Sequence, residues 1–151
     1  MSTKADYNAE EWTLVVQAPA LAGMRVIAAD RGGTVRESVS MGRVYQEARA
    51  EAGDGLLAEI VAAPPGFEPG RGRELLEQLP DQLRRAVEIL EDKATSEELE
   101  AYKSFVLDVA ETVAKAHKEG GFLGIGGTQI SEGERTALQE IAGALGVTYG
   151  A

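Results

Sequence analysis

Carboxylates beside expected helix starts are the side chains whose type and spacing come closest to metal chemistry. Asp30 and Glu37 flank a glycine turn, and Glu132 and Glu134 open the last apolar segment. Carboxylate oxygens are the ligands that calcium, magnesium and manganese prefer, so these four residues are candidate ligands of a divalent cation. The same glutamates have a structural use, because acidic side chains in a first helical turn cap the helix or complement its dipole. Both interpretations stay open at this point.

Catalysis finds less support in the residue types. The chain contains one histidine, His117, and no cysteine. A general base needs a neighbouring nucleophile and an orienting acid, and the sequence pairs His117 with neither. We expect a capping or surface role for His117 near a helix C-terminus, and we predict no catalytic residue, no cofactor and no enzymatic activity.

A glycine-rich loop at 120–128 permits three interpretations. Bare backbone amides can hold a phosphate before a helix, but here no strand precedes the glycines and no Lys-Ser/Thr pair follows them. The apolar residues of the loop can instead fold back as a plug over the end of a bundle, or face water as a partner-binding patch. In the last case the partner-binding residues are Phe122, Leu123 and Ile125.

Helix starts are the strongest local signal. A cap residue followed three positions later by glutamate forms reciprocal hydrogen bonds with the first backbone amides of a helix. The sequence contains this pattern at Asn8/Glu11, Thr34/Glu37, Thr95/Glu98 and Ser131/Glu134.

Apolar spacing of three and four residues extends from each start. We predict a short first helix from Asn8 that Pro19 ends, because proline lacks the amide of a helix interior. Further helices are expected through Leu21 toward Gly32, from Thr34 to near Gly53, and over 56–61. The next helical run, around Leu79-Pro80, is expected to kink or to split in two at this step. The longest element is expected from Thr95 for some twenty residues, and the last helix from Ser131 to about Leu145.

Glycines within these helices need a compensating reason. Gly23, Gly42 and Gly143 each cost about 1 kcal/mol against alanine in a helix interior. Close approach of a neighbouring helix would offset that cost.

These elements predict an all-α protein: a single-domain helical bundle of about six or seven helices. Hydrophobic residues make up 44% of the 151 residues and aromatic residues only 5%, so the core must be mainly aliphatic. We expect a flexible polar leader over 1–7, and a helical domain over 8–151 that contains a proline- and glycine-rich linker at 63–72.

The net charge of −10 bears on partners. It opposes association with nucleic acid and with anionic membranes, so neither is expected. The N-terminal residues carry acids and no long apolar run, which is unlike a signal peptide or a membrane span. The lack of cysteine fits a reducing compartment, and a cytoplasmic location is expected.

The C-terminal segment Thr128 to Arg135, followed by the apolar positions Leu138, Ile141 and Leu145, resembles the closing helix of TerB-like domains. The turn Ala28-Ala29-Asp30 is similar to the acidic turn of that family. TerB-like domains are all-helical and are associated with tellurite resistance and stress responses. The resemblance implies a divalent-cation site, and Asp30, Glu37, Glu132 and Glu134 are the positions that would form it.

Two functions are therefore hypotheses. The first is a non-enzymatic cytoplasmic interaction or scaffold protein, which binds a protein partner or itself. The alternative is a carboxylate metal-binding stress-response domain of the TerB type.

Overall fold

The computed structural model describes residues 4–29, 34–51, 55–62, 72–119 and 132–147, and within these ranges every regular element is helical. A short 3-10 turn, η1 (Lys4–Asp6), precedes seven α-helices. The helices are α1 (Ala9–Ala29), α2 (Thr34–Glu51), α3 (Leu56–Ala62), α4 (Gly72–Glu77), α5 (Leu79–Lys93), α6 (Ser96–Glu119) and α7 (Glu132–Leu145). The all-α prediction is confirmed.

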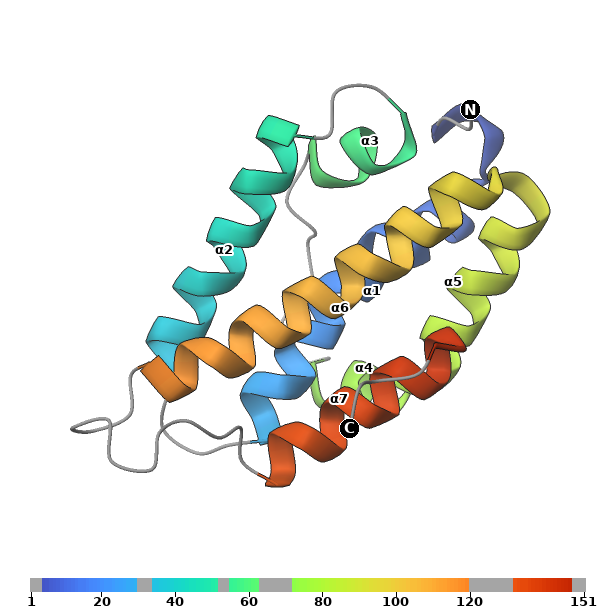
Figure 1. Cartoon of the computed structure of the whole chain (residues 1–151). Coiled ribbons are helices and arrows are strands. Elements are labelled where there is room, and N and C mark those ends of the chain that lie inside the picture. The colour runs from blue at the N-terminus through green and yellow to red at the C-terminus, as the bar shows by residue number, and fades with distance from the viewer. Residues whose placement is uncertain (1–3, 30–33, 52–54, 63–71, 120–131, 148–151) are drawn as a thin grey trace.

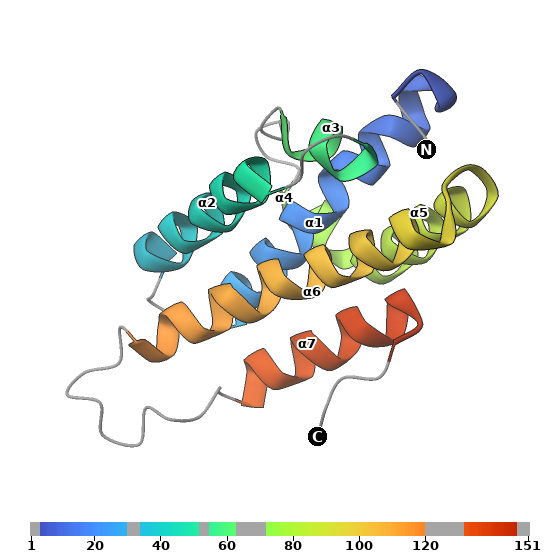
Figure 2. The same cartoon turned by 45° about the horizontal axis from the view of Figure 1, so that its top comes forward.

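The centre of the bundle is the pair α1 and α6, which cross its middle (Figure 1). Helices α2 and α3 pack on one flank of this pair, and α5 and α7 pack on the other, as the turned view also shows (Figure 2). The short helix α4 contacts α1 and α5. No helix in the described ranges is long and apolar enough to cross a lipid bilayer.

Capping determines where two of the helices begin. Asn8 Oδ1 accepts the Glu11 amide at 2.8 Å, and Glu11 Oε1 accepts the Asn8 amide at 3.0 Å. Thr95 and Glu98 exchange the same two bonds before α6, at 3.0 and 3.1 Å. Both predicted capping boxes are therefore confirmed. Helix α7 begins directly after Ser131, as predicted, but the hydrogen bonds of that box and of the Thr34 box lie outside the described side chains.

One predicted boundary is wrong. Pro19 does not end a first helix, because α1 continues through it to Ala29 as one element. Proline removes the amide that would bond the carbonyl four residues earlier, which is that of Val15. The hydroxyl of Tyr102 in α6 donates to this carbonyl at 2.7 Å. A tertiary contact thus supplies the missing donor and lets the helix continue.

The second expected interruption is present. Pro80 lies at the start of α5, where its missing amide is not needed, and Gln78 forms a turn between α4 and α5. The prediction that the Leu79-Pro80 step kinks this run or splits it in two is confirmed, since one turn residue separates α4 from α5.

The core is largely aliphatic, with a few aromatic rings. Buried residues from α1, α2, α3, α5, α6 and α7 form one cluster, to which Tyr45 and Phe105 add an edge-to-face pair with ring centroids 5.2 Å apart. Tyr7 is also buried, at 7% exposure, and its ring lies 5.6 Å from that of Trp12. The last part of the expected flexible leader is therefore packed, and the folded domain extends beyond Asn8 to Tyr7 and the η1 turn.

The helix glycines differ from expectation at two positions. Gly42 and Gly143 are exposed, and a Cβ added at either would meet nothing within 4 Å. No close helix approach offsets their cost in the described structure, so that expectation is wrong for both. Gly23 is buried in the middle of α1.

Candidate functional site

The structure describes only some of the four predicted metal ligands. Asp30 lies outside the described residues, and for Glu37 and Glu132 the helical backbone is described but the side chain is not. Glu134, in the first turn of α7, is 1% exposed and is the buried charged residue of the described set. Within the described ranges no three His, Cys, Asp or Glu side chains are grouped so that they could hold a metal ion. The metal site stays a prediction.

The glycine loop and the histidine are not described in the detail that the predictions need. Phe122, Leu123 and Ile125 all lie outside the described residues. His117 belongs to the last turns of α6, which ends at Glu119, but its side chain is not described. The partner-binding role of the loop and the role of His117 stay predictions.

The structure instead reveals a cleft of about 370 Å³ between α1 and α5. From α1 it is lined by Ala9, Glu10, Glu11, Thr13, Leu14 and Gln17. From α5 it is lined by Gln82, Arg85 and Ile89. This volume is within the range of pockets that bind ligands or anchor side chains of a partner.

The cleft lies at the N-terminal half of α1, which is less buried than the middle of the helix. From Ala18 to Gly23 every residue of α1 is buried, as expected of the central helix of a bundle. Over the preceding two turns, Glu10 and Thr13 are exposed and Leu14 and Gln17 are half-buried. Helix α5 lies beside this half, and the described residues that line the cleft all belong to α1 and α5.

Residue spacing explains why these side chains share the cleft. Glu10, Thr13, Leu14 and Gln17 follow each other at intervals of three, one and three residues, which places them on one face of α1. Gln82, Arg85 and Ile89 are related in the same way on α5. Leu14 and Ile89 pack against the core cluster, so the floor of the cleft is apolar while charged and amide groups surround it.

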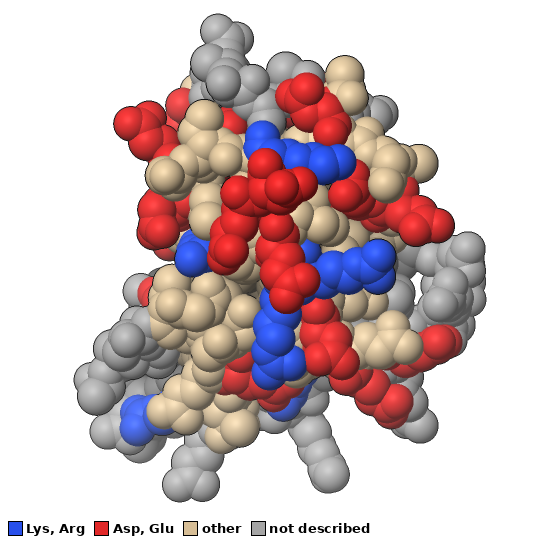
Figure 3. All heavy atoms as spheres, turned by 90° about the vertical axis from the view of Figure 1, so that its right-hand side faces the viewer, with Lys and Arg blue, Asp and Glu red and all other residues tan. Residues whose placement is uncertain are grey.

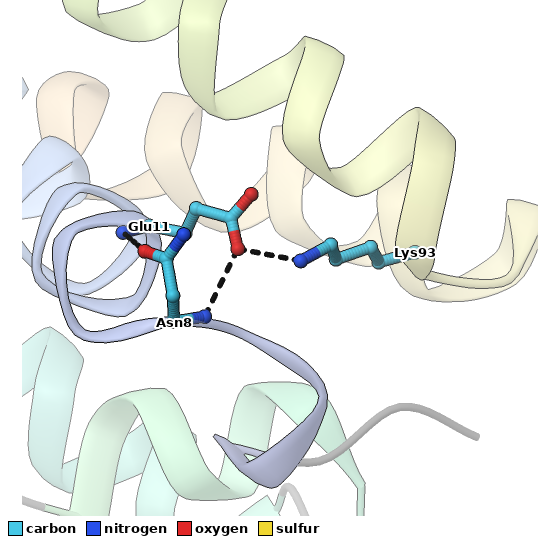
Figure 4. A network of polar contacts seen from close by, with 3 residues as sticks. All are labelled: Asn8, Glu11 and Lys93. Carbon is cyan, nitrogen blue, oxygen red and sulfur yellow. Dashed lines mark hydrogen bonds and ion pairs between the residues drawn. The ribbon is translucent and has the colours of Figure 1, made fainter.

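One end of the cleft is fixed by a polar network (Figure 4). Glu11 Oε1 accepts both the Asn8 amide and the Lys93 ammonium, the latter at 2.5 Å. The Lys93 nitrogen also lies 5.7 Å from the centre of the Tyr7 ring. The capping glutamate of α1 is therefore also the ionic contact to the last turn of α5, and it holds the two helix ends together.

The electrostatics of this network favour the charged forms. The hydrogen bond from Lys93, followed by that from the Asn8 backbone, lowers the pKa of Glu11. The same bond raises the pKa of Lys93. Arg85 adds a weaker attraction that further lowers the pKa of Glu11. Both partners of the Glu11–Lys93 pair are charged at neutral pH.

The opposite end of the cleft carries amides. Gln82 Nε2 donates to Gln78 Oε1 at 3.4 Å. Gln82 Oε1 is shielded from solvent and has no hydrogen-bond partner among the described residues. A shielded acceptor without a donor is unfavourable by about 1–3 kcal/mol, so this end can gain from a donor that a bound molecule supplies.

Acidic groups are frequent on the outer side of α5, beside the cleft. Asp81, Glu88 and Asp92 are exposed on the outer side of the helix, and Arg84 is paired with Asp81 at 2.9 Å. Figure 3 looks at the side of the molecule formed by α5 and the start of α6, and acidic side chains predominate on it. This potential favours a cationic ligand.

Sequence reasoning missed this cleft. Periodicity could show that Glu10, Thr13 and Gln17 share the polar face of a helix, but a polar face is the usual state of a surface helix. The missing information was that α5 lies beside this face, and no local pattern gives the neighbour of a helix.

Known proteins provide no guide to the role of the cleft. No protein-family model, curated protein sequence or solved structure matches the chain. Its function must therefore be inferred from its own residues and their geometry.

Proposed function

We propose that this chain is a non-enzymatic interaction or scaffold protein of the cytoplasm, and that a partner protein binds it in the cleft between α1 and α5. The observation that carries the proposal is the cleft itself, which has an apolar floor at Leu14 and Ile89 and a polar rim. Protein interfaces combine an apolar centre with a polar rim in this way.

The charged groups of the cleft suit binding better than proton transfer. A general acid or base works best when its pKa is near the operating pH. The pKa of Glu11 is lowered by Lys93 and Asn8, away from neutrality. This carboxylate therefore acts as a fixed charge that positions a helix end.

A pair of matched substitutions tests the proposal. Thr13 is exposed on the wall of the cleft, whereas Thr136 is exposed on α7, away from it. Thr13→Arg places a long side chain in the cleft, and Thr136→Arg adds the same side chain and the same charge elsewhere. Each variant is tagged and expressed in the organism that encodes the chain, and its co-purifying proteins are identified. Circular dichroism verifies that both variants are folded.

We expect the unmodified chain and Thr136→Arg to retain a common partner that Thr13→Arg loses. If all three proteins retain the same partners, the cleft is not the binding surface. A partner whose binding is lost in Leu123→Asp and unaffected by Thr13→Arg would place the contact at the glycine loop.

Calorimetric titration with calcium, magnesium and manganese discriminates the alternative, a divalent-metal-binding domain of the TerB type. For the interaction protein we expect weak heats that do not saturate. Saturable binding that is lost in both Asp30→Asn and Glu134→Gln would favour the metal-binding domain instead.

A further inference from the structure

The shape of the cleft indicates what kind of segment fits it. The N-terminal end of α1 lies beside the C-terminal end of α5, because Glu11 contacts Lys93. Gln17 and Gln82 both line the opposite end, so the two helices run antiparallel along the cleft. A groove between two antiparallel helices is the place where a further helix packs in a bundle. A helix added there would cover the less buried N-terminal half of α1, as neighbouring helices already cover Ala18 to Gly23.

The charges in and beside the cleft indicate the composition of that helix. Glu10, Glu11 and Arg85 line the cleft, and Lys93 neutralises Glu11, so the charges of the lining itself nearly balance. The negative excess comes from exposed acids on the outer side of α5, which include Glu88 and Asp92. Lys and Arg side chains complement these exposed acids, whereas acidic side chains would be repelled by them.

Gln82 Oε1, which lacks a hydrogen-bond donor among the described residues, also favours a basic partner. Lys and Arg carry several N–H donors and no acceptor. A basic side chain that reaches this end of the cleft would supply the hydrogen bond that Gln82 Oε1 lacks among the described residues.

A second copy of the chain is a poor occupant. Each copy carries a net charge of −10, so two copies repel each other over the whole approach. The complementary partner is a different and locally basic protein.

We propose that the cleft binds an amphipathic helix of a partner protein, with an apolar stripe placed on Leu14 and Ile89 and with Lys or Arg residues beside the stripe. This inference rests on the proposed function and specifies the partner's chemistry. The recognition mode is that of a helix lying in a groove, with anchors at intervals of three and four residues.

Synthetic peptides test the chemistry directly. The probe is an amphipathic peptide of about 20 residues, long enough to be helical in water, with leucine at i, i+3, i+4 and i+7 and lysine at most other positions. A second peptide has glutamate in place of lysine, and a third has the lysine and leucine residues in scrambled order. Binding is followed by amide chemical shifts of the isotopically labelled full chain.

We expect the basic amphipathic peptide to bind with shifts centred on residues 9–17 and 82–89. Thr13→Arg should weaken this binding at least about tenfold, which corresponds to about 1.4 kcal/mol, while Thr136→Arg should change it little. Glu10→Gln should weaken it more than Glu47→Gln, which removes an exposed charge on α2.

The inference would be overturned by no binding of the basic amphipathic peptide, by equal binding of the scrambled peptide, or by equal weakening by both arginine variants. The last two would show that the peptide binds an acidic surface without using the cleft. Preferred binding of the acidic peptide in the cleft would also overturn it. None of these results would reject the proposed function, which is tested by whether Thr13→Arg loses the cellular partner.

Discussion

The hydroxyl of Tyr102 donates a hydrogen bond of 2.7 Å to the carbonyl of Val15, the group that Pro19 deprives of its helical amide. Tyr102 is fully buried, and burial raises the pKa of its phenol, so the hydroxyl keeps its proton and acts as a donor. The contact joins α1 to α6 at the point where α1 lacks a bond of its own.

This relationship predicts a coupling between two substitutions. Tyr102→Phe should lower the free energy of unfolding by about 1–3 kcal/mol, because a buried carbonyl loses its donor. In a Pro19→Ala background the new amide of residue 19 can bond Val15, so Tyr102→Phe should be less destabilising there. Urea unfolding of the four proteins measures the difference. An equal effect of Tyr102→Phe in both backgrounds would show that Pro19 and Tyr102 act independently.

Glu98 links two helix starts. One carboxylate oxygen accepts the Thr95 amide before α6, and the other accepts the Leu56 amide at the start of α3, at 3.3 Å. Glu98→Ala should destabilise the protein by about 1–2 kcal/mol, as the loss of a capping group does, and should speed hydrogen exchange at Leu56. Glu97→Ala, at the next exposed position, is the control and should leave the exchange of the Leu56 amide unchanged. Unchanged exchange in Glu98→Ala would mean that α3 does not depend on this bond.

The Glu11–Lys93 pair predicts that the stability of the folded protein decreases at both low and high pH. Because the pKa of Glu11 is lowered in the folded protein, its contribution to stability is present above the ordinary glutamate pKa of about 4.3 and is lost as the pH falls through the folded value. Because the pKa of Lys93 is raised, its contribution is present below about 10.4 and is lost as the pH rises through the folded value.

Carbon-detected NMR titration of the Glu11 carboxyl measures its pKa in the folded protein, which sets the low-pH limit. In Lys93→Gln the pKa of Glu11 should move back toward its ordinary value. The control is Lys103→Gln, which removes a lysine that lies 4.0 Å from Glu100 on α6. A Glu11 pKa that is the same with and without Lys93 would contradict the assigned cause.

The next prediction concerns three glycines that have the same free space for a Cβ but differ in backbone conformation. A Cβ at Gly42, Gly143 or Gly146 would meet nothing within 4 Å, but only Gly146 has a positive φ, of 77°. Gly42→Ala and Gly143→Ala should each stabilise the protein by about 0.5–1 kcal/mol, since alanine is the better helix former. Gly146→Ala should destabilise it by about 1–2 kcal/mol, because the left-handed backbone at the end of α7 disfavours a Cβ. Thermal unfolding of the three variants checks the sign of each effect, and stabilisation by Gly146→Ala would contradict this account.

Local interactions explain which parts of the fold could be predicted. The Asn8 and Thr95 capping boxes, the split before Pro80 and the end of α7 near Leu145 depend on residues within a few positions of each other, and a sequence pattern records them. Pro19 also belongs to a local pattern, but its outcome depended on Tyr102, which is distant in the sequence. A local rule could not anticipate that donor.

The candidate site was not predictable for a related reason. Glu10 and Arg85 are ordinary charged residues of two helices, and they line one cleft because α1 and α5 lie side by side. The residues that the sequence did single out, such as Glu134, were identified by their positions at expected helix starts. Glu134 proves to be buried, which helical spacing alone did not indicate.

The central position of α1 has a consequence for the way the chain is made. This helix emerges from the ribosome before the helices that cover it, and its stretch from Ala18 to Gly23 is buried by helices that include α6 and α7 near the other end of the sequence. During translation that stretch has no native cover until most of the chain has been synthesised. The nascent protein therefore exposes this apolar stretch of α1 for most of its synthesis, which leaves it open to non-native contacts and to molecular chaperones.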